Sequence, residues 1–208
     1  MHSIRKLLTG GLVTAVALGS LSAHAAVVVF NPFMDNDDAS ANVNVIITLE
    51  DDGSGGVTGV AEVAPTLLLP NIGDIRGLFF DFASGSVVCA DVTGADVTDC
   101  GLNVANLGGG ANINPLGPFD LGIEIGSSGI GGGDDIQSTS FAISGISTSD
   151  FAQASVRLTS VGVGDLRDNS SKLKPVEGDR PPNEVPAPGV LGLLAVGLLG
   201  LAARARRS

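Results

Sequence analysis

The 208-residue chain contains no tryptophan, no tyrosine and only two histidines, which are His2 and His24. Both histidines lie in the first 25 residues, so the rest of the chain has no imidazole side chain. This absence excludes a Ser-His-Asp triad, a Cys-His pair and a histidine-ligated zinc site from the body of the protein. An enzyme built from this body would have to use carboxylates, hydroxyls, lysine or arginine alone. We therefore predict a protein that is not an enzyme.

Basic residues are also scarce outside the two ends of the chain. Residues 26–184 keep all 22 acidic residues but only 6 of the 11 basic ones, which gives a formal net charge of −16. A body of this charge has no basic patch with which to bind nucleic acid or an anionic membrane surface. The acidic excess suits a soluble protein outside the cell, and it can attract divalent cations.

Cysteine occurs twice, as Cys89 and Cys100. The spacing is not that of a CxxC motif, and no further metal ligands adjoin it. We predict that the pair forms one disulfide in an oxidising compartment. Because the closed loop is short, the expected stabilisation is about 3 kcal/mol or less.

The N-terminus has the three parts of a secretory signal peptide. Arg5 and Lys6 provide a positive start, an apolar stretch follows from Leu7 to Leu21, and Ala23 and Ala25 supply the small-x-small cleavage pattern. Residues 1–25 are therefore predicted to direct the chain through the Sec translocon and to be removed by signal peptidase after Ala25. The alternative is an N-terminal core helix.

The C-terminus has the reverse arrangement, an apolar run followed by positive charge. Residues 189–203 are uncharged, and Arg204, Arg206 and Arg207 follow them. Fifteen residues form a helix of roughly 22 Å, which is short for a hydrocarbon core of about 30 Å. The arginines would hold the end of the chain on the cytoplasmic side while the body is exported. This pattern predicts either a plain tail anchor or a sorting signal that is later removed.

The tail resembles a PEP-CTERM sorting signal over residues 185–208, through VPAP, then GVLGLLAVGLLGLAA, then RARR. The motif residues are Val185, Pro186, Ala187 and Pro188, and Ala187 stands where the family usually has glutamate. The resemblance implies a Gram-negative bacterium that makes exopolysaccharide. It also implies cleavage near the Pro-containing motif by an exosortase, a membrane-embedded, transpeptidase-like protease. The protein would then be tethered transiently to the inner membrane before it reaches the cell surface or the extracellular matrix of a biofilm.

Alternating apolar and polar residues dominate the body. In VNVIITLE, Val43, Val45, Ile47 and Leu49 fall on one face of a strand, and the following EDDGSGG predicts a hairpin turn. FDLGIEIG, residues 119–126, alternates in the same way, with Asp120 and Glu124 predicted to point outward.

About 160 residues can bury one core, so we expect one domain. The pattern predicts an all-β fold, a single antiparallel, jelly-roll-like β-sandwich over residues 26–163. A signal helix would precede it and a C-terminal hydrophobic helix would follow. STSDFAQ, residues 147–153, predicts one helical turn that Phe151 anchors to the core. Residues 164–184 are polar and contain proline, and they predict a linker whose first part could still pack on the sheet through Leu166 and Leu173.

The only candidate cofactor is Ca²⁺, because carboxylates in flexible loops are suitable oxygen ligands for it. The spacing of an EF-hand is not met, and solvated turn residues are the alternative interpretation. The candidate ligands are Asp35, Asp37, Asp38, Asp134 and Asp135.

Taken together, these patterns favour an exported surface or matrix protein with a structural or interaction role, and exopolysaccharide is a candidate partner. A Ca²⁺-dependent adhesin or carbohydrate-binding module is the alternative. A hydrolase that uses only carboxylates is the third and weakest hypothesis, since it needs two acids facing each other across a cleft.

Overall fold

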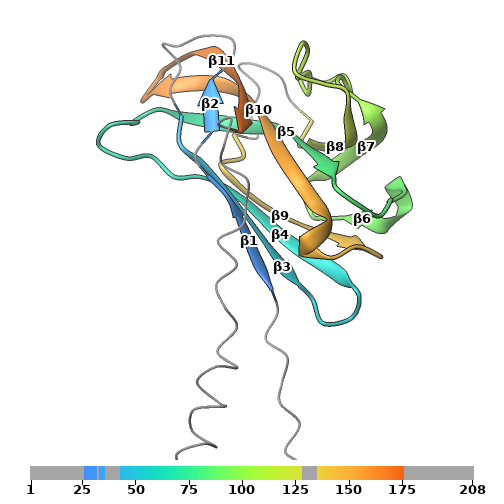
Figure 1. The fold of residues 1–208 in the computed structure, drawn as a ribbon. Helices are drawn as coiled ribbons and strands as arrows, with labels where there is room; N and C mark the ends of the chain where they lie inside the picture. Colours follow the sequence, from blue (N-terminus) through green and yellow to red (C-terminus); the bar gives the residue numbers. More distant parts are fainter. Residues whose placement is uncertain (1–25, 32, 36–42, 128–134, 176–208) are drawn as a thin grey trace, which may run out of the picture.

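The computed structural model describes residues 26–31, 33–35, 43–127 and 135–175 (Figure 1). These residues form strands and two short 3-10 helices. In chain order they are β1 (Val27–Phe30), β2 (Phe33–Asp35), β3 (Val45–Asp51), β4 (Gly56–Val63), β5 (Ile72–Phe82), η1 (Cys89–Asp91), β6 (Val92–Thr93), β7 (Val97–Val104), β8 (Phe119–Ile125), β9 (Ser138–Ser144), η2 (Thr148–Asp150), β10 (Phe151–Val163) and β11 (Leu166–Pro175).

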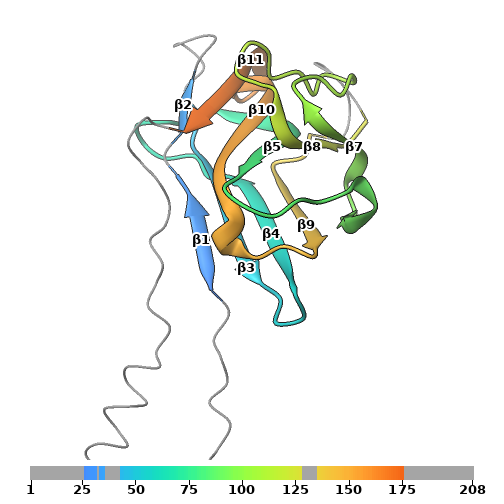
Figure 2. The same ribbon diagram turned by 45° about the vertical axis from the view of Figure 1, so that its right-hand side comes forward.

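The strands form two sheets that face each other as a sandwich (Figures 1 and 2). The five-stranded sheet has the order β1-β3-β4-β9-β6, and the six-stranded sheet has the order β2-β11-β10-β5-β8-β7. All pairings between these named strands are antiparallel. The predicted all-β antiparallel sandwich is therefore confirmed.

The core lies between the sheets and follows the predicted alternation. Val45, Ile47 and Leu49 of β3 are fully buried, and so are Leu121 and Ile123 of β8. Burying one such side chain contributes about 1.5–3 kcal/mol relative to leaving it in water. The period-2 pattern thus identified the core-facing side chains of β3 and, for Leu121 and Ile123, of β8, whereas Phe119 at the start of β8 packs with Phe79 in a separate cluster.

The predicted hairpin is β3–β4, with Asp51 opposite Val57 as its last pair. Asp52 closes the turn, because its Oδ1 accepts hydrogen bonds from the backbone N–H groups of Ser54 (2.7 Å) and Gly56 (2.9 Å). These two N–H groups lower the pKa of the Asp52 carboxyl. The carboxylate therefore works as a turn cap, in the Asx geometry that aspartate favours.

A chain of phenylalanine rings joins the two sheets through the core. The Phe80 ring of β5 lies 5.7 Å from Phe141 of β9 and 5.4 Å from Phe151, measured between centroids. Room for Phe141 comes from Gly59, directly opposite it on β4, where an added Cβ would lie 2.2 Å from the Phe141 Cζ. The aromatic chain thus requires glycine at that one position of β4.

The predicted boundary between sandwich and linker at residue 163 is wrong. Residues 166–175 form β11, which pairs with β10 on one side and with β2 on the other. Leu173 is 1% exposed and belongs to the core, whereas Leu166 is 78% exposed. Backbone pairing and one buried leucine hold this polar segment in the sheet, and composition alone does not reveal either of them. Residues 176–184, the rest of the predicted linker, lie outside the described residues.

The predicted helical turn is η2. Asp150 accepts hydrogen bonds from the Ser147 N–H and hydroxyl (2.9 Å each) and from the Ser84 hydroxyl. These bonds, with Ser84 the largest contributor, lower the pKa of Asp150. Phe151 follows at 6% exposure and anchors the turn to the core, as predicted.

Candidate functional site

An open hollow of about 240 Å³ lies at one end of the six-stranded sheet, where β5 and β7 end and β8 begins. Its walls come from three strands and from the loop that follows β5. It combines an aromatic ring, aliphatic side chains, a hydroxyl, an amide and a carboxylate, so it offers both apolar and hydrogen-bonding contacts. The lining residues are Phe82, Gly85, Ser86, Val87, Leu102, Asn103 and Asp120.

The carboxylate of the hollow is held in place by the backbone. Asp120 Oδ2 accepts a hydrogen bond from the Phe82 N–H (2.8 Å). The Asp120 N–H donates in turn to Asp81 Oδ1 (3.1 Å), and Gln153 Nε2 donates to the other oxygen of Asp81. These bonds tie the end of β5 to the start of β8, so the Asp120 side chain has a defined orientation.

The amide of the hollow comes from an unusual backbone position. Asn103 has a φ of 49°, in the left-handed region that asparagine and glycine tolerate best. It is one residue from the end of β7, the strand at the edge of the sheet. The turn away from extended geometry places Asn103 on the wall of the hollow.

The predicted disulfide braces the same end of the molecule. Cys89 of η1 is bonded to Cys100 of β7, with Cα atoms 5.6 Å apart. The bond joins the loop that provides Val87 to the strand that provides Leu102. It therefore limits how far the two walls of the hollow can separate.

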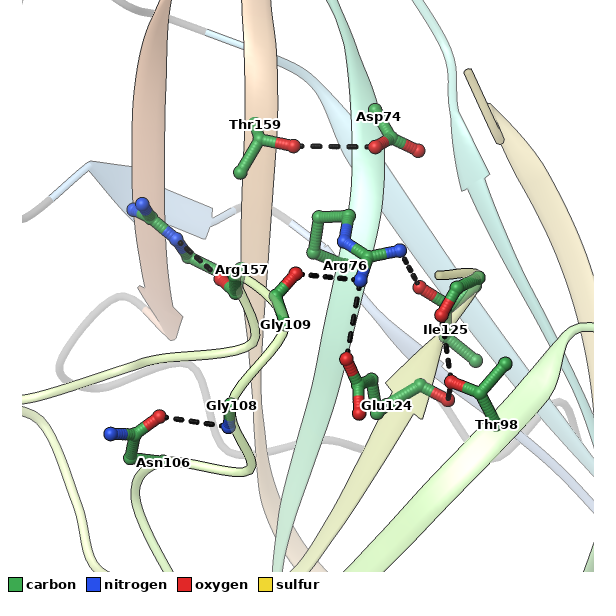
Figure 3. A network of polar contacts seen from close by, with 12 residues as sticks. Asp74, Arg76, Thr98, Asn106, Gly108, Gly109, Glu124, Ile125, Arg157 and Thr159 are labelled. Carbon is green, nitrogen blue, oxygen red and sulfur yellow. Dashed lines mark hydrogen bonds and ion pairs between the residues drawn. The ribbon is translucent and has the colours of Figure 1, made fainter. Parts of the chain in front are cut away.

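A buried ion pair lies on the outer face of the six-stranded sheet (Figure 3). Arg76 is fully buried, and its Nη2 lies 3.2 Å from Glu124 Oε1. The same nitrogen donates to the Gly109 carbonyl oxygen (2.7 Å), and Nη1 donates to the Ile125 carbonyl oxygen. The guanidinium thus joins two strands and the loop between β7 and β8.

The loop between β7 and β8 also explains why the prediction for Glu124 failed. Glu124 was expected to point into solvent, and it does lie on the outward face of β8, but the loop covers it and leaves it 9% exposed. Burial raises the pKa of Glu124, nearby Arg76 opposes that rise, and Asp99 adds to it. The outer face of β8 is therefore buried beneath the β7–β8 loop, separately from the core between the sheets.

Glycine makes the covering possible. A Cβ on Gly109 would lie 1.9 Å from Glu124 Oε1, and the residue has a φ of 50°. A Cβ on Gly77 would lie 2.7 Å from the Phe79 ring, which packs beneath the loop with Ile113. The Gly-rich stretch at residues 108–110 is thus the lid over the ion pair.

The predicted calcium ligands are only partly within the described residues. Asp135 forms an ion pair with Arg167, and Asp35 lies at the end of β2, where its backbone pairs with Leu173. In the part of the chain that the structure describes, no three acidic or other metal-ligating side chains come together. Asp37, Asp38 and Asp134 lie outside it, so the calcium hypothesis stays a prediction.

The residues predicted for export and sorting also lie outside the described residues. They are Ala23, Ala25, Val185, Pro186, Ala187, Pro188, Arg204, Arg206 and Arg207. Within the residues that are described, no helix is long and apolar enough to cross a bilayer. The signal-peptide and sorting assignments therefore stay predictions from sequence.

No known family model, curated protein or solved structure matches this chain. The fold alone assigns no function, because β-sandwiches carry many unrelated functions. A functional interpretation must therefore start from the residues of this chain.

The hollow was not predicted from sequence. Its residues are spread over nearly 40 positions, from Phe82 to Asp120, and no motif links them. Asp120 was singled out only as an outward residue of its strand. The one local signal is Asn103 near the end of β7, since asparagine tolerates the left-handed backbone that this position adopts.

Proposed function

We propose that this protein is exported, held briefly at the inner membrane by its C-terminal segment, and cut by an exosortase-type protease. It then acts, without catalysis, at the cell surface or in the extracellular matrix. The observation that carries the proposal is the three-part pattern at residues 185–208, a Pro-containing motif, an apolar run and a basic end. Its N-terminal counterpart at residues 1–25 has the features of an export signal.

Two features of the body support this proposal. The Cys89–Cys100 disulfide fits an oxidising compartment. The sandwich also has a strong acidic excess, which favours solubility after release. A structural role is further supported by the absence of histidine after residue 24, which excludes the side chain most often used as a general acid or base.

Replacing both Pro186 and Pro188 by alanine is expected to block processing, because the substitutions remove the motif where cleavage is proposed. The measurement is mass spectrometry of the chain from cells with an active exosortase. The wild-type chain should end near residues 185–188, and the variant should still end at Ser208. Ala187→Glu, which restores the usual family residue, should be processed at least as completely.

The matched control replaces Pro181 and Pro182, which precede the motif, and should be processed normally. A wild-type chain that still ends at Ser208 in exosortase-positive cells would refute the sorting proposal. The same truncated end in cells without the exosortase would assign the cut to another protease.

Carbohydrate binding is the second candidate function, and the hollow favours it. Phe82 offers an apolar ring, while Asp120, Asn103 and Ser86 offer a carboxylate, an amide and a hydroxyl. A sugar presents apolar C–H faces and paired hydroxyls, which match such a mixture. Exopolysaccharide, the candidate partner from the sequence, is the ligand to test first.

Asn103→Gly is expected to weaken saccharide binding about 3- to 10-fold, the loss of roughly one neutral hydrogen bond. Glycine keeps the left-handed backbone at this position and removes only the amide. The measurement is calorimetry with oligosaccharides selected on a glycan array, in Ca²⁺ and in chelator. Loss of binding in chelator would favour the Ca²⁺-dependent alternative.

The control is Thr93→Ala, an exposed position on β6 of the other sheet. It should leave the affinity unchanged. Equal affinities for wild type and Asn103→Gly would exclude the hollow as the saccharide site.

A further inference from the structure

The loop between β4 and β5 presents two leucines to solvent. Leu67 is 102% exposed and Leu68 is 91% exposed, relative to an extended reference. The loop projects beyond the sheets in both views (Figures 1 and 2). Single exposed apolar residues are normal on a folded protein, but adjacent, fully exposed leucines at a loop tip indicate a contact site.

The loop is held in a defined shape. The Thr66 N–H donates to the Leu69 carbonyl oxygen (2.9 Å), and the Leu69 N–H donates to the Thr66 hydroxyl oxygen (3.0 Å). At its base, Asn44 Nδ2 donates to the Ala64 carbonyl oxygen (2.8 Å), and the Ala64 N–H donates to the Asn44 carbonyl oxygen (2.9 Å). Because the turn is already ordered, a contact through the leucines costs little further conformational entropy.

The surroundings extend the apolar character of the tip. No charged residue occurs between Glu62 and Asp74 in this acidic body. The neighbouring β10–β11 hairpin adds Val163 (56% exposed) and Leu166 (78% exposed) at the same end of the sandwich, because Gly162 lies opposite Ile72. This end therefore presents exposed apolar side chains on two adjacent loops, with Asp165 as the charged residue between Val163 and Leu166.

We propose that the loop inserts Leu67 and Leu68 into the surface of a lipid bilayer, the one in which the C-terminal segment is held. This inference rests on the proposed membrane tether. Two leucine tips cover far less than the roughly 800 Å² per partner that a stable protein interface buries. A bilayer requires no complementary surface and accepts a few protruding apolar side chains at the boundary of headgroups and acyl chains.

The length of chain beyond the described residues permits this contact. Thirteen residues, 176 to 188, separate Pro175 from the apolar run that begins at Gly189. An extended chain of this length spans at most about 47 Å. Pro175, at the end of β11, is ten residues along the strand from the β10–β11 hairpin, which lies beside the loop that carries Leu67 and Leu68. Ten residues of strand span roughly 33 Å. The tethered body can therefore turn its leucine loop to the same bilayer.

The negative charge of the body predicts which lipid headgroups the loop should contact most strongly. The net charge of −16 over residues 26–184 opposes approach to an anionic surface, and Asp165 lies at the neighbouring hairpin. The contact should therefore be strongest on zwitterionic lipid and weaken as anionic lipid is added.

The test uses the chain from residue 26 to 208 in phosphatidylcholine vesicles that carry a nitroxide quencher on the acyl chains. An environment-sensitive fluorophore is attached through Leu68→Cys, and the native cysteines do not react because they form the disulfide. The matched probe is Ser54→Cys, in the exposed β3–β4 turn at the opposite end of β4. Quenching at position 68 should exceed that at position 54 severalfold, and phosphatidylglycerol should reduce it.

A third probe, Ala195→Cys, reports the tail separately. A quenched tail probe with equal, low quenching at positions 68 and 54 would overturn the lipid contact and leave the tether intact. If the probe at position 195 is not quenched, the membrane tether is overturned. Quenching at position 68 alone would then support a lipid contact that does not depend on the tether. Low quenching at all three positions would overturn both proposals. A concentration-dependent blue shift at position 68 without vesicles would assign the loop to self-association instead.

A final variant checks that the leucines themselves make the contact. With the probe placed through Leu166→Cys, on the neighbouring hairpin, Leu67→Ser combined with Leu68→Ser should lower the quenching to the level of the Ser54 probe. Unchanged quenching would refute a role for the two leucines.

Discussion

Replacing Arg76 by leucine is expected to destabilise the folded protein by about 3–5 kcal/mol, because it leaves a buried carboxylate without its partner. Arg76 is fully buried and Glu124 is 9% exposed, so little water reaches the carboxylate to replace the lost contact. The variant also loses the hydrogen bonds that hold the Gly109 and Ile125 carbonyl oxygens. Urea unfolding at pH 7.5 with the disulfide intact measures the loss.

The pH dependence of this loss identifies its cause. Burial already raises the pKa of Glu124 in the folded state, and removing Arg76 takes away the charge that opposes the rise. A carboxyl with a raised folded pKa stabilises the fold below its ordinary pKa, and this stability is lost as the pH rises through the folded pKa. The deficit of Arg76→Leu should therefore be smaller at pH 4 than at pH 7.5.

The matched control is Arg167→Leu, which removes the partly exposed ion pair with Asp135. It should cost at most about 1 kcal/mol. The double variant Arg76→Met with Glu124→Leu should recover much of the loss, because apolar residues of similar volume often replace a buried ion pair without penalty. Equal, small losses in Arg76→Leu and Arg167→Leu would contradict the buried-pair interpretation.

Replacing Phe80 by alanine is expected to cost about 3–5 kcal/mol, the usual range for a buried phenylalanine. Phe80 is fully buried and contacts Phe141 of the opposite sheet as well as Phe151 of its own. The substitution opens a cavity between the sheets and breaks the aromatic chain that joins them. Chemical unfolding of the oxidised protein measures the change in free energy.

Two further variants separate the ring from general core filling. Phe80→Leu should cost less than Phe80→Ala, because it refills much of the cavity. Val60→Ala, at a position of β4 that is 43% exposed, should change the free energy of unfolding by no more than about 0.5 kcal/mol. If Phe80→Ala cost no more than Val60→Ala, the proposed connection between the sheets would be wrong.

The successful fold predictions came from local patterns. The alternation in residues 43–50 and 119–126 identified strands and their buried faces, because side chains on a strand alternate with a period of two. The Gly-rich turn predicted the β3–β4 hairpin, and the Ser147–Asp150 spacing predicted η2. Each signal is contained within about ten residues, so it can be read without the tertiary structure.

The failures came from contacts between distant residues. Glu124 has the spacing of an outward residue, but Arg76, 48 positions away, and the loop at Gly109 bury it. Residues 166–175 have the composition of a linker, but they pair with β10 and β2. No local pattern reports a partner that the chain meets only after it has folded.

The sequence by itself determined the absence of histidine chemistry, the acidic charge, the positions of the cysteines and the strand-forming alternation. It also supplies the signal-peptide and sorting-motif arguments for export and sorting, which stay proposals. Only the tertiary structure decided how the strands are ordered, which outward residues are covered, where the hollow forms and that Leu67 and Leu68 are left exposed. The physical reason is that residue chemistry and period are local properties, whereas burial depends on which distant segments pack together.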